Sequence, residues 1–214
     1  MNYFSEILNE RNKILIFGLN GQLGQTFNYF FEKSENILQL SSKDVNFLEP
    51  NLISNVINDF KPNYIINTSA YTDVDMAESN SYEAFKVNGE ALKFMAEAAK
   101  NNKSLLIHYS TDYVFDGQNS IRYKPTDIPN PINIYGKSKQ TGEQNILKSG
   151  CDFVIFRISW LVSEFGNNFI KTIISKLEND KELFIVNDQI GTPISSKLVA
   201  NITAKTILLI HITL

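Results

Sequence analysis

The pair of residues best suited to acid–base chemistry is Tyr135 and Lys139, four positions apart. If the segment is helical, residues at this spacing lie on one face. A free tyrosine has a pKa near ~10 and exchanges protons poorly at neutral pH, but a nearby ammonium group favours the phenolate and lowers that pKa. We therefore expect Tyr135 to protonate an oxygen that becomes negative as a hydride reaches its carbon, although the same spacing also arises by chance on many helices.

A second polar group ends the fourth predicted strand, in the run HYSTD. The hydroxyl of Thr111 could bond a substrate carbonyl oxygen and orient it towards Tyr135, or it could simply close a turn at the strand end. We expect His108 to point into the strand packing, and with only His211 elsewhere it has no partner for a metal site or a catalytic triad. Cys151 begins a buried strand and is expected in the core rather than as a nucleophile.

The glycines Gly18, Gly21 and Gly24 lie between a predicted strand and a predicted helix. Glycine at these positions allows a tight turn, a close approach of the backbone to a pyrophosphate, and close packing of the helix on the strand. The N-terminus of the helix adds free N–H groups and partial positive charge. The motif predicts a dinucleotide site, with a glycine-rich turn that binds no ligand as the alternative.

The second predicted strand ends where dinucleotide-binding proteins distinguish their cofactors. An acidic residue there favours NAD, because it bonds the ribose 2′-hydroxyl. Serine stands at that position here, and Lys43 beside it could accept a 2′-phosphate, so NADPH is favoured over NADH. Asp44 could meet the adenine or cap the following helix. After the third strand, Ser69 and Ala70 are small enough to leave room for a cofactor, or to form a close-packed turn.

Alternating strands and helices supply the frame for these groups. The predicted strands are 13–17, 36–40, 64–67, 105–109, 153–158 and 183–186, and the predicted helices run from the glycine turn to about 31 and over 52–60, 82–100, 138–147, 168–177 and 195–209. We expect a short polar helix or tail before residue 13 and a surface loop over 116–133. The alternation predicts an α/β fold, a Rossmann-like, doubly wound parallel sheet with right-handed crossovers.

Composition restricts the class of protein. The length of 214 residues suits one large domain or one domain and a fragment. A net charge of −3 gives no basic surface, so neither nucleic acid nor an anionic membrane is an expected partner. The single cysteine excludes an internal disulfide and fits a reducing compartment. With neither a signal-peptide core nor an apolar run of roughly 20 residues, the sequence predicts a soluble cytoplasmic protein.

The glycine turn, Thr111 and the Tyr135/Lys139 pair, in this order, resemble the extended short-chain dehydrogenase/reductase superfamily. The segments NTSAYTDVDMAE, HYSTDYVFDG, NPINIYGKSKQTGE, FRISWLVSEFGNNF and VNDQIGTP look like the dTDP-4-dehydrorhamnose reductase family, over roughly residues 13–200. The resemblance implies NAD(P)H-dependent reduction of the C4 keto group of a dTDP-linked 4-keto-6-deoxyhexose, which gives dTDP-L-rhamnose. It also allows magnesium and a homodimer, for which the residues themselves give no sign.

The resemblance implies two sets of site residues. The cofactor would contact Gly18, Gly21, Gln22, Leu23, Gly24, Asp44, Val45, Ser69, Ala70, Tyr71, Tyr109, Tyr135 and Lys139, with residues 21–23 at the pyrophosphate and residues 44–45 near the adenine. The sugar nucleotide would contact Thr111, Asp112 and Trp160. Tyr135 would donate the proton, and Lys139 would hold the nicotinamide ribose and tune Tyr135. Trp160 would stack on the hexose, unless it is a core aromatic.

Two departures from the family pattern bear on function. Asn20 replaces a threonine in the glycine turn, and the chain stops at Leu214, whereas the family continues for several dozen residues that complete a smaller sugar-nucleotide domain. We therefore expect an N-terminal extension (1–12), a cofactor domain (13–160) and a partial sugar-nucleotide region (161–214) that is interleaved with the sheet. Alternative functions are a non-catalytic dinucleotide-binding subunit, like the regulatory subunit of methionine adenosyltransferase, or a truncated reductase with poor turnover.

Overall fold

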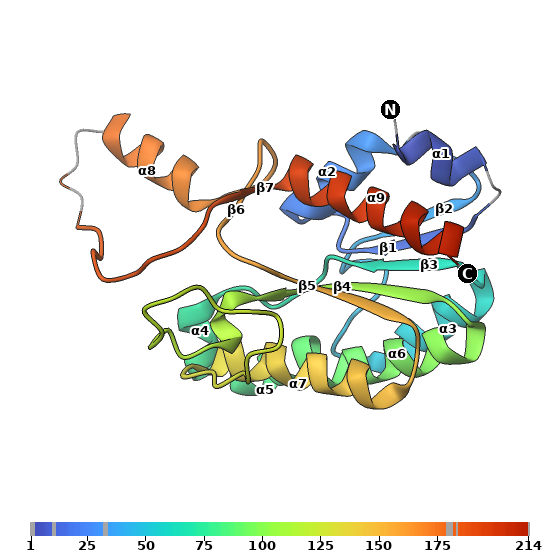
Figure 1. The fold of residues 1–214 in the computed structure, drawn as a ribbon, viewed down its shortest axis with the longest axis horizontal. Coiled ribbons are helices and arrows are strands. Elements are labelled where there is room, and N and C mark those ends of the chain that lie inside the picture. Colours follow the sequence, from blue (N-terminus) through green and yellow to red (C-terminus); the bar gives the residue numbers. More distant parts are fainter. Residues whose placement is uncertain (1–2, 10–11, 32–33, 179–181, 183, 214) are drawn as a thin grey trace.

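The structure, a computed structural model, describes residues 3–9, 12–31, 34–178, 182 and 184–213. Its centre is a five-stranded parallel sheet in the order β2-β1-β3-β4-β5 (Figure 1). The strands are β1 Ile14–Phe17, β2 Ile37–Leu40, β3 Tyr64–Asn67, β4 Leu105–Thr111 and β5 Phe153–Ile158. The Rossmann-like class is confirmed, because the buried aliphatic runs form inner strands covered on both faces.

Two layers of helices cover the sheet (Figure 1). One face carries α1 Tyr3–Asn9, α2 Gln22–Phe30 and α9 Ser196–Thr213, and the other carries α3 Pro50–Phe60, α6 Ala91–Asn102 and α7 Ile134–Ser149. Alternation along β1 divides the core, because Ile14 and Ile16 face the first layer while Leu15 and Phe17 face the second.

Short elements surround the end of the sheet where the strands finish. They are α4 Val74–Ser79, α5 Ser81–Phe85, the π-helix η1 Lys86–Glu90 and the 3₁₀-helix η2 Asp112–Val114. A second, two-stranded sheet pairs β6 Leu161–Val162 with β7 Ile194–Ser195. The helix α8 Phe169–Glu178 lies between these two strands in the chain and extends away from the main sheet (Figure 1). Within the described residues, no helix has both the length and the apolarity to cross a membrane.

The strand predicted at 183–186 is wrong for the three residues that the structure describes there, and residue 183 lies outside them. Phe184 and Val186 are 91% and 65% exposed, and neither belongs to a strand. In the described part of the chain, β5 pairs only with β4, so this apolar run has no neighbouring strand to bond.

Three helix predictions need correction. The polar N-terminal segment forms a helix whose Phe4 and Ile7 are buried, with Phe4 against the aromatic rings of α2 and residue 31. The helix predicted over 82–100 is interrupted by the π-turn η1, and α7 begins at Ile134, four residues earlier than predicted. The loop at 116–133 is confirmed as a segment without helix or strand.

Candidate active site

A cleft of about 1100 Å³ opens above the carboxyl ends of the strands. It lies where the strand order reverses, because β1 is followed by β2 on one side and by β3 on the other. Ligands of doubly wound sheets bind at such a point. The lining comes mainly from the glycine turn, the segments after β2 and β3, the end of β4, two residues of α7, and the segments 158–162, 166–170 and 185–193.

The glycine turn is built for close backbone contacts. Gly18 has φ +95°, and a Cβ there would lie 2.5 Å from the Thr68 hydroxyl oxygen. A Cβ at Gly24 would overlap the carbonyl oxygen of Gly18, so this glycine lets α2 pack on the turn and does not line the cleft. Gly21 precedes α2 and, having no side chain, leaves its first N–H groups without a side-chain cap. Because Gly21, Gln22 and Leu23 line the cleft, this helix end suits a phosphate.

The predicted adenine residues lie outside the cleft lining. Val45 is 2% exposed and packs in the core, while Asp44 Oδ2 accepts bonds from the backbone N–H and the hydroxyl of Ser41, at 2.8 and 2.7 Å. These bonds, the hydroxyl's above all, lower the pKa of Asp44. Asp44 therefore closes the turn after β2. It does not cap the following helix, because the residue before α3 is Glu49. Ser42, which the sequence did not single out, lines the cleft instead.

The segment after β3 is fixed to α7 by a buried amide. Ser69, Ala70 and Tyr71 line the cleft, as expected for cofactor contacts. Asn88 in η1 bonds both the backbone N–H and the carbonyl of Tyr71, at 2.9 and 3.0 Å, and donates to the Ser138 hydroxyl at 2.9 Å. Sequence reasoning missed Asn88, whose signal was a polar residue on the buried side of a predicted helix. π-turns are often found at functional sites.

Tyr135 and Lys139 lie on one face of α7, as predicted, and both line the cleft. Asn133 caps the helix through a 2.7 Å bond to the N–H of Gly136. Burial raises the pKa of Tyr135 to about 12, while a hydrogen bond with Thr111 lowers it and the charge of Asp112 raises it. The predicted lowering of this pKa is therefore wrong, because burial outweighs every favourable contact of the phenolate.

The pKa of Lys139 is itself lowered, which explains why this lysine does not lower the pKa of Tyr135. It is 1% exposed, and burial lowers its pKa to about 7, with the charge of Glu143 acting in the opposite direction. Its Nζ donates to the carbonyl oxygen of Tyr109 at 2.7 Å and lies 3.2 Å from Nε2 of His108. An amine with a pKa near neutrality carries only part of a positive charge at pH 7, so it attracts a phenolate weakly.

His108 has a more specific place than strand packing. It is fully buried, as expected, but its ring bridges Lys139 and the amide of Asn67, whose Nδ2 lies 3.1 Å from Nδ1 of His108. Burial drives the pKa of His108 well below its usual value, so the ring is neutral. The signal in the sequence was two polar residues inside adjacent buried strands, since Asn67 and His108 are direct partners in the register of β3 and β4.

At the end of β4, Thr111 closes a turn and also lines the cleft, and its bond to a substrate carbonyl stays a prediction. Its hydroxyl donates to Asp112 Oδ1 at 3.1 Å and accepts from the N–H of Tyr113 at 3.2 Å, which starts η2, and the residue also lines the cleft. Asp112 Oδ2 accepts from the Ser159 hydroxyl at 2.6 Å. Ser110 also lines the cleft, and its buried hydroxyl has no partner among the described residues. A buried hydroxyl of this kind fits a ligand that supplies the missing bond.

Tyr109 connects the cleft to the last helix. Its ring stacks on Phe156, and its hydroxyl lies 2.7 Å from the Thr203 hydroxyl oxygen of α9. Burial raises the pKa of Tyr109 far above its usual value, so the phenol stays protonated. Tyr109 is therefore a buried, anchored part of the cleft wall, and its contact with the cofactor stays a prediction.

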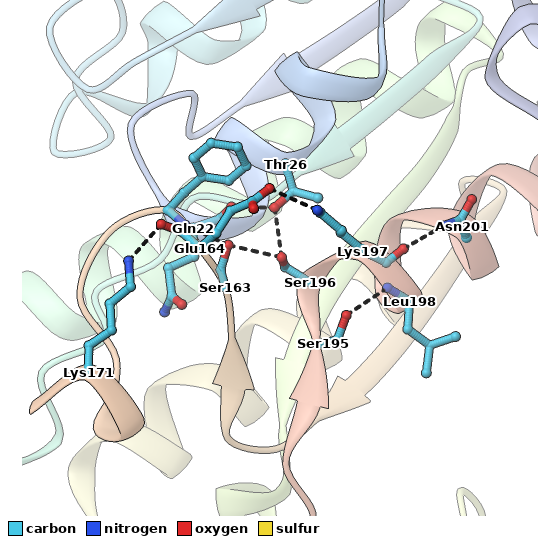
Figure 2. A network of polar contacts seen from close by, with 11 residues as sticks. Gln22, Thr26, Ser163, Glu164, Lys171, Ser195, Ser196, Lys197, Leu198 and Asn201 are labelled. Atoms are coloured by element: carbon cyan, nitrogen blue, oxygen red, sulfur yellow. Dashed lines mark hydrogen bonds and ion pairs between the residues drawn. The ribbon is translucent and has the colours of Figure 1, made fainter. Parts of the chain in front are cut away.

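A polar network joins the second sheet to α2 (Figure 2). The hydroxyl of Thr26 donates to Ser196, whose hydroxyl donates to Ser163, at 2.8 and 3.0 Å. Beside these bonds, Lys197 pairs with Glu164 at 3.0 Å (Figure 2). The buried hydroxyls hold β6 and the start of α9 against the helix that follows the glycine turn.

Trp160 lies on the cleft wall in a strained conformation. The residue is 38% exposed, so the core-aromatic alternative is wrong, and its ring centroid lies 5.7 Å from that of Phe169. Its φ of +43° is left-handed, which is costly for a residue with a Cβ and typical of functional positions. Cys151 is buried, as predicted, and burial raises the pKa of its thiol.

The described residues contain no group of three His, Cys, Asp or Glu side chains able to hold a metal ion, so magnesium gains no support. The fold and the cleft define a Rossmann-type protein of the short-chain dehydrogenase/reductase class, with Tyr135, Lys139 and Thr111 lining the cleft and, at its edge, a glycine turn that suits a phosphate. Residues 12–211 match the family model of the RmlD substrate binding domain. The chain belongs to this family.

Curated relatives and solved structures agree with this assignment. The chain is 40% identical over 192 residues to the dTDP-4-dehydrorhamnose reductase of Aggregatibacter actinomycetemcomitans, covering 89% of this chain and 65% of that protein. It is 38% identical to the dTDP-4-dehydrorhamnose reductase of Burkholderia thailandensis, covering 90% of this chain and 64% of that protein. The chain therefore spans just under two thirds of the length of these relatives. The reductase of Bacillus anthracis, solved in complex with NADP, superposes with a TM-score of 0.86 at 34% identity, covering 92% of this chain and 70% of that one.

Proposed function

We propose that the chain binds NADPH or NADH in the cleft and reduces the C4 keto group of a dTDP-linked 4-keto-6-deoxyhexose, the conversion of dTDP-4-dehydro-L-rhamnose to dTDP-L-rhamnose. The observation that carries the proposal is the meeting of Tyr135, Thr111 and Lys139 in the cleft that Gly21 also lines. Relatives of the same family that are named dTDP-4-dehydrorhamnose reductase support the choice of substrate.

The reduced nicotinamide would supply the hydride, and the chain would supply the proton. The hydroxyl of Thr111 would turn its one proton from Asp112 Oδ1 to the carbonyl oxygen of the sugar. As that oxygen becomes an alkoxide, Tyr135 gives it a proton and becomes a phenolate. A Tyr135 pKa of about 12 keeps the proton on the phenol at neutral pH, and an alkoxide is basic enough to take it. Acid catalysis by Tyr135 therefore does not need the lowered pKa that the sequence predicted.

NADPH is the favoured cofactor. The Bacillus anthracis reductase was solved with NADP, and the exposed Lys43 stands next to Ser42 in the cleft lining, where a 2′-phosphate could be met. The carboxylate of Asp44 is engaged by Ser41 and is less available to a ribose hydroxyl. The adenine contacts of Asp44 and Val45, the magnesium ion and the homodimer remain predictions from the resemblance.

The sugar nucleotide would lie between the end of β4 and Trp160. Asp112 and Thr111 offer a carboxylate and a hydroxyl to the hexose, and the partly exposed indole offers a face for stacking. The division into a cofactor domain (13–160) and a sugar-nucleotide region (161–214) is part of this proposal. The packing of α9 on the face of the sheet that α1 and α2 cover supports a second region that is interleaved with the first.

A second candidate is a protein that binds the dinucleotide but turns over poorly, as a truncated reductase or a regulatory subunit would. Large apolar side chains that are exposed beside the cleft favour this second candidate. They are Phe184, Ile185 and Ile190, and each is more than half exposed. Calorimetric titration with NADPH, followed by the loss of reduced nicotinamide absorbance on adding dTDP-4-dehydro-L-rhamnose, separates the candidates. Binding with turnover supports the reductase, binding alone supports the second candidate, and no binding contradicts both.

A further inference from the structure

The indole of Trp160 packs against a stretch of backbone that carries no side chain. A Cβ placed on Gly191 would lie 2.5 Å from Cε2, 2.8 Å from Nε1 and 2.9 Å from Cδ2 of Trp160. Trp160 lines the cleft and Gly191 does not, so Gly191 lies behind the ring as seen from the cleft. Any side chain at residue 191 would therefore meet the indole before it met a ligand.

The same distances show that Gly191 lies over a face of the indole. Cδ2 and Cε2 are the carbons shared by the two rings of the indole. An atom in the plane of these rings, at 2.5 Å from Cε2 and 2.9 Å from Cδ2, would overlap the ring atoms themselves. The position of the absent Cβ is therefore above the ring plane. Protein interiors are close-packed, and only a glycine lets the ring and the backbone come this near.

The backbone conformation does not itself require glycine at residue 191. The glycines with positive φ are Gly18, Gly117, Gly150 and Gly166, and Gly191 is not one of them. An alanine could adopt the conformation of Gly191 as far as its own backbone is concerned. The indole of Trp160 is thus the feature of the structure that calls for the missing side chain.

Other contacts hold Trp160 in place. Its carbonyl oxygen accepts from the N–H of Ile194 at 3.2 Å, beside the point where Leu161 pairs with Ile194 in the second sheet. Its left-handed φ of +43° sets the direction in which the side chain leaves the backbone. The ring of Phe169 lies 5.7 Å away, centroid to centroid, with the two planes at 44°. With Gly191 over one face, the 38% of the residue that is exposed includes the side that lines the cleft.

We propose that Gly191 is a positioning residue, which lets the indole of Trp160 lie flat on the backbone so that its opposite face forms a wall of the hexose site. The proposal rests on the proposed function for the identity of the ligand, whereas the packing of the indole is independent of it. An indole face is a large, rigid apolar surface, which suits the C–H groups and the methyl group of a 6-deoxyhexose. A methyl group at residue 191 would push the ring into the cleft and narrow the space for the sugar.

Fluorescence of the full chain without ligands tests the packing, because Trp160 is the only tryptophan in the sequence. In Gly191→Ala the ring leaves the backbone, so its emission should move to longer wavelength and acrylamide should quench it more strongly. Ile190→Ala, which changes the neighbouring side chain, 102% exposed, is the matched control and should match the wild type. Identical emission and quenching in Gly191→Ala and the wild type would overturn the proposal.

A measurement on the wild type covers the case in which Gly191→Ala does not fold. Protons over the face of an indole are shielded by its ring current. The Hα signals of Gly191 should therefore lie upfield of the usual glycine range in the NMR spectrum, and they should return to that range in Trp160→Leu. Signals of Gly191 at usual glycine positions in the wild type would also overturn the proposal.

Kinetics then test the role of Gly191 at the sugar site. In Gly191→Ala, the KM for dTDP-4-dehydro-L-rhamnose should rise by about two- to tenfold, the range that one aromatic contact supplies. The kcat and the affinity for NADPH should stay close to the wild type. In a Trp160→Leu background, Gly191→Ala should leave this KM unchanged, because no indole remains to be displaced. An unchanged KM in the single variant, or the same rise in both backgrounds, contradicts the positioning role.

Failure of the proposed function and failure of this inference give different results. A wild type that binds no NADPH but shows shielded Gly191 signals would refute the proposed function and leave the positioning of the indole by Gly191 standing. Turnover of the sugar nucleotide with usual Gly191 signals would support the proposed function and overturn this inference.

Discussion

The hydroxyl oxygens of Tyr109 and Thr203 lie 2.7 Å apart, which joins the wall of the cleft to the last helix of the chain. The hydroxyl of Thr203 also donates to the carbonyl of Val199 at 2.9 Å, so the proton between the two hydroxyls comes from Tyr109. Both residues are buried. The helix α9 therefore contributes to the rigidity of a cleft whose lining residues, among those described, run no further along the chain than Pro193.

Removal of one partner of this bond should cost more than removal of the other. Thr203→Val leaves the buried phenol of Tyr109 without an acceptor, and we expect a loss of about 1–3 kcal/mol in the free energy of unfolding. Tyr109→Phe leaves Thr203 bonded to Val199 and should cost less than about 1 kcal/mol. Urea unfolding measures both, with Thr206→Val, a partly exposed threonine of α9, as the control. Equal losses in the first two variants would contradict this assignment of donor and acceptor.

Asn88 should be important both for stability and for cofactor binding. Asn88→Ala removes three hydrogen bonds that fix the segment at Tyr71 to Ser138. With buried groups left unpaired, we expect a loss of about 2–4 kcal/mol in unfolding free energy and a weaker affinity for NADPH. Asn145→Ala, which loses a single bond to the carbonyl of Gly89, is the matched control. Unchanged NADPH affinity in a folded Asn88→Ala protein would show that the segment does not need this anchor.

The left-handed backbone at Trp160 gives an unusual order of stability. Glycine has no Cβ to strain at φ +43°, so Trp160→Gly should be more stable than Trp160→Ala by about 1 kcal/mol. At Ile174, inside α8, the order should be the opposite, with alanine favoured over glycine by a similar amount. Thermal unfolding of the four variants checks this. An alanine variant at residue 160 that matches or exceeds the glycine variant would argue against strain at this position.

Burial of Lys139 should make stability depend on pH. Its pKa is about 7 in the folded chain and ~10.4 when unfolded, so between these values the unfolded chain binds one more proton. The penalty is fully present below pH 7 and is relieved as the pH rises from 7 towards 10, by on the order of 1 kcal/mol per unit. Lys139→Met should be more stable than the wild type at pH 7 and should lack this part of the slope. Urea unfolding at pH 7, 8 and 9 measures the difference, and parallel curves for the two proteins would contradict it.

Much of the fold and of the candidate site could be predicted from the sequence, because periodicity and glycine placement are local signals. The five central strands, the glycine turn and the common face of Tyr135 and Lys139 follow from such patterns. The apolar run at 184–186 failed as a strand because strand formation needs a neighbour, which composition does not reveal. The predicted lowering of the Tyr135 pKa was wrong for a similar reason. That pKa depends on the burial of the phenol and on the partial neutrality of Lys139.

The contacts that were missed depend on long-range pairing. His108 and Asn67 are ordinary positions in two strands until the register brings them side by side. In the sequence, Asn88 is one polar residue of a predicted helix, and only the π-helix η1 directs its side chain to Tyr71. A sequence indicates that such buried polar residues need partners, but only the fold identifies them.

The central claim is that Tyr135 protonates the reduced sugar. We expect Tyr135→Phe to keep the NADPH affinity of the wild type and to lower the rate of NADPH oxidation with dTDP-4-dehydro-L-rhamnose by about 10²–10⁴-fold. Tyr82→Phe, which alters a tyrosine that is 71% exposed, should oxidise NADPH at the wild-type rate. A Tyr135→Phe protein that turns over as fast as the wild type would contradict the account.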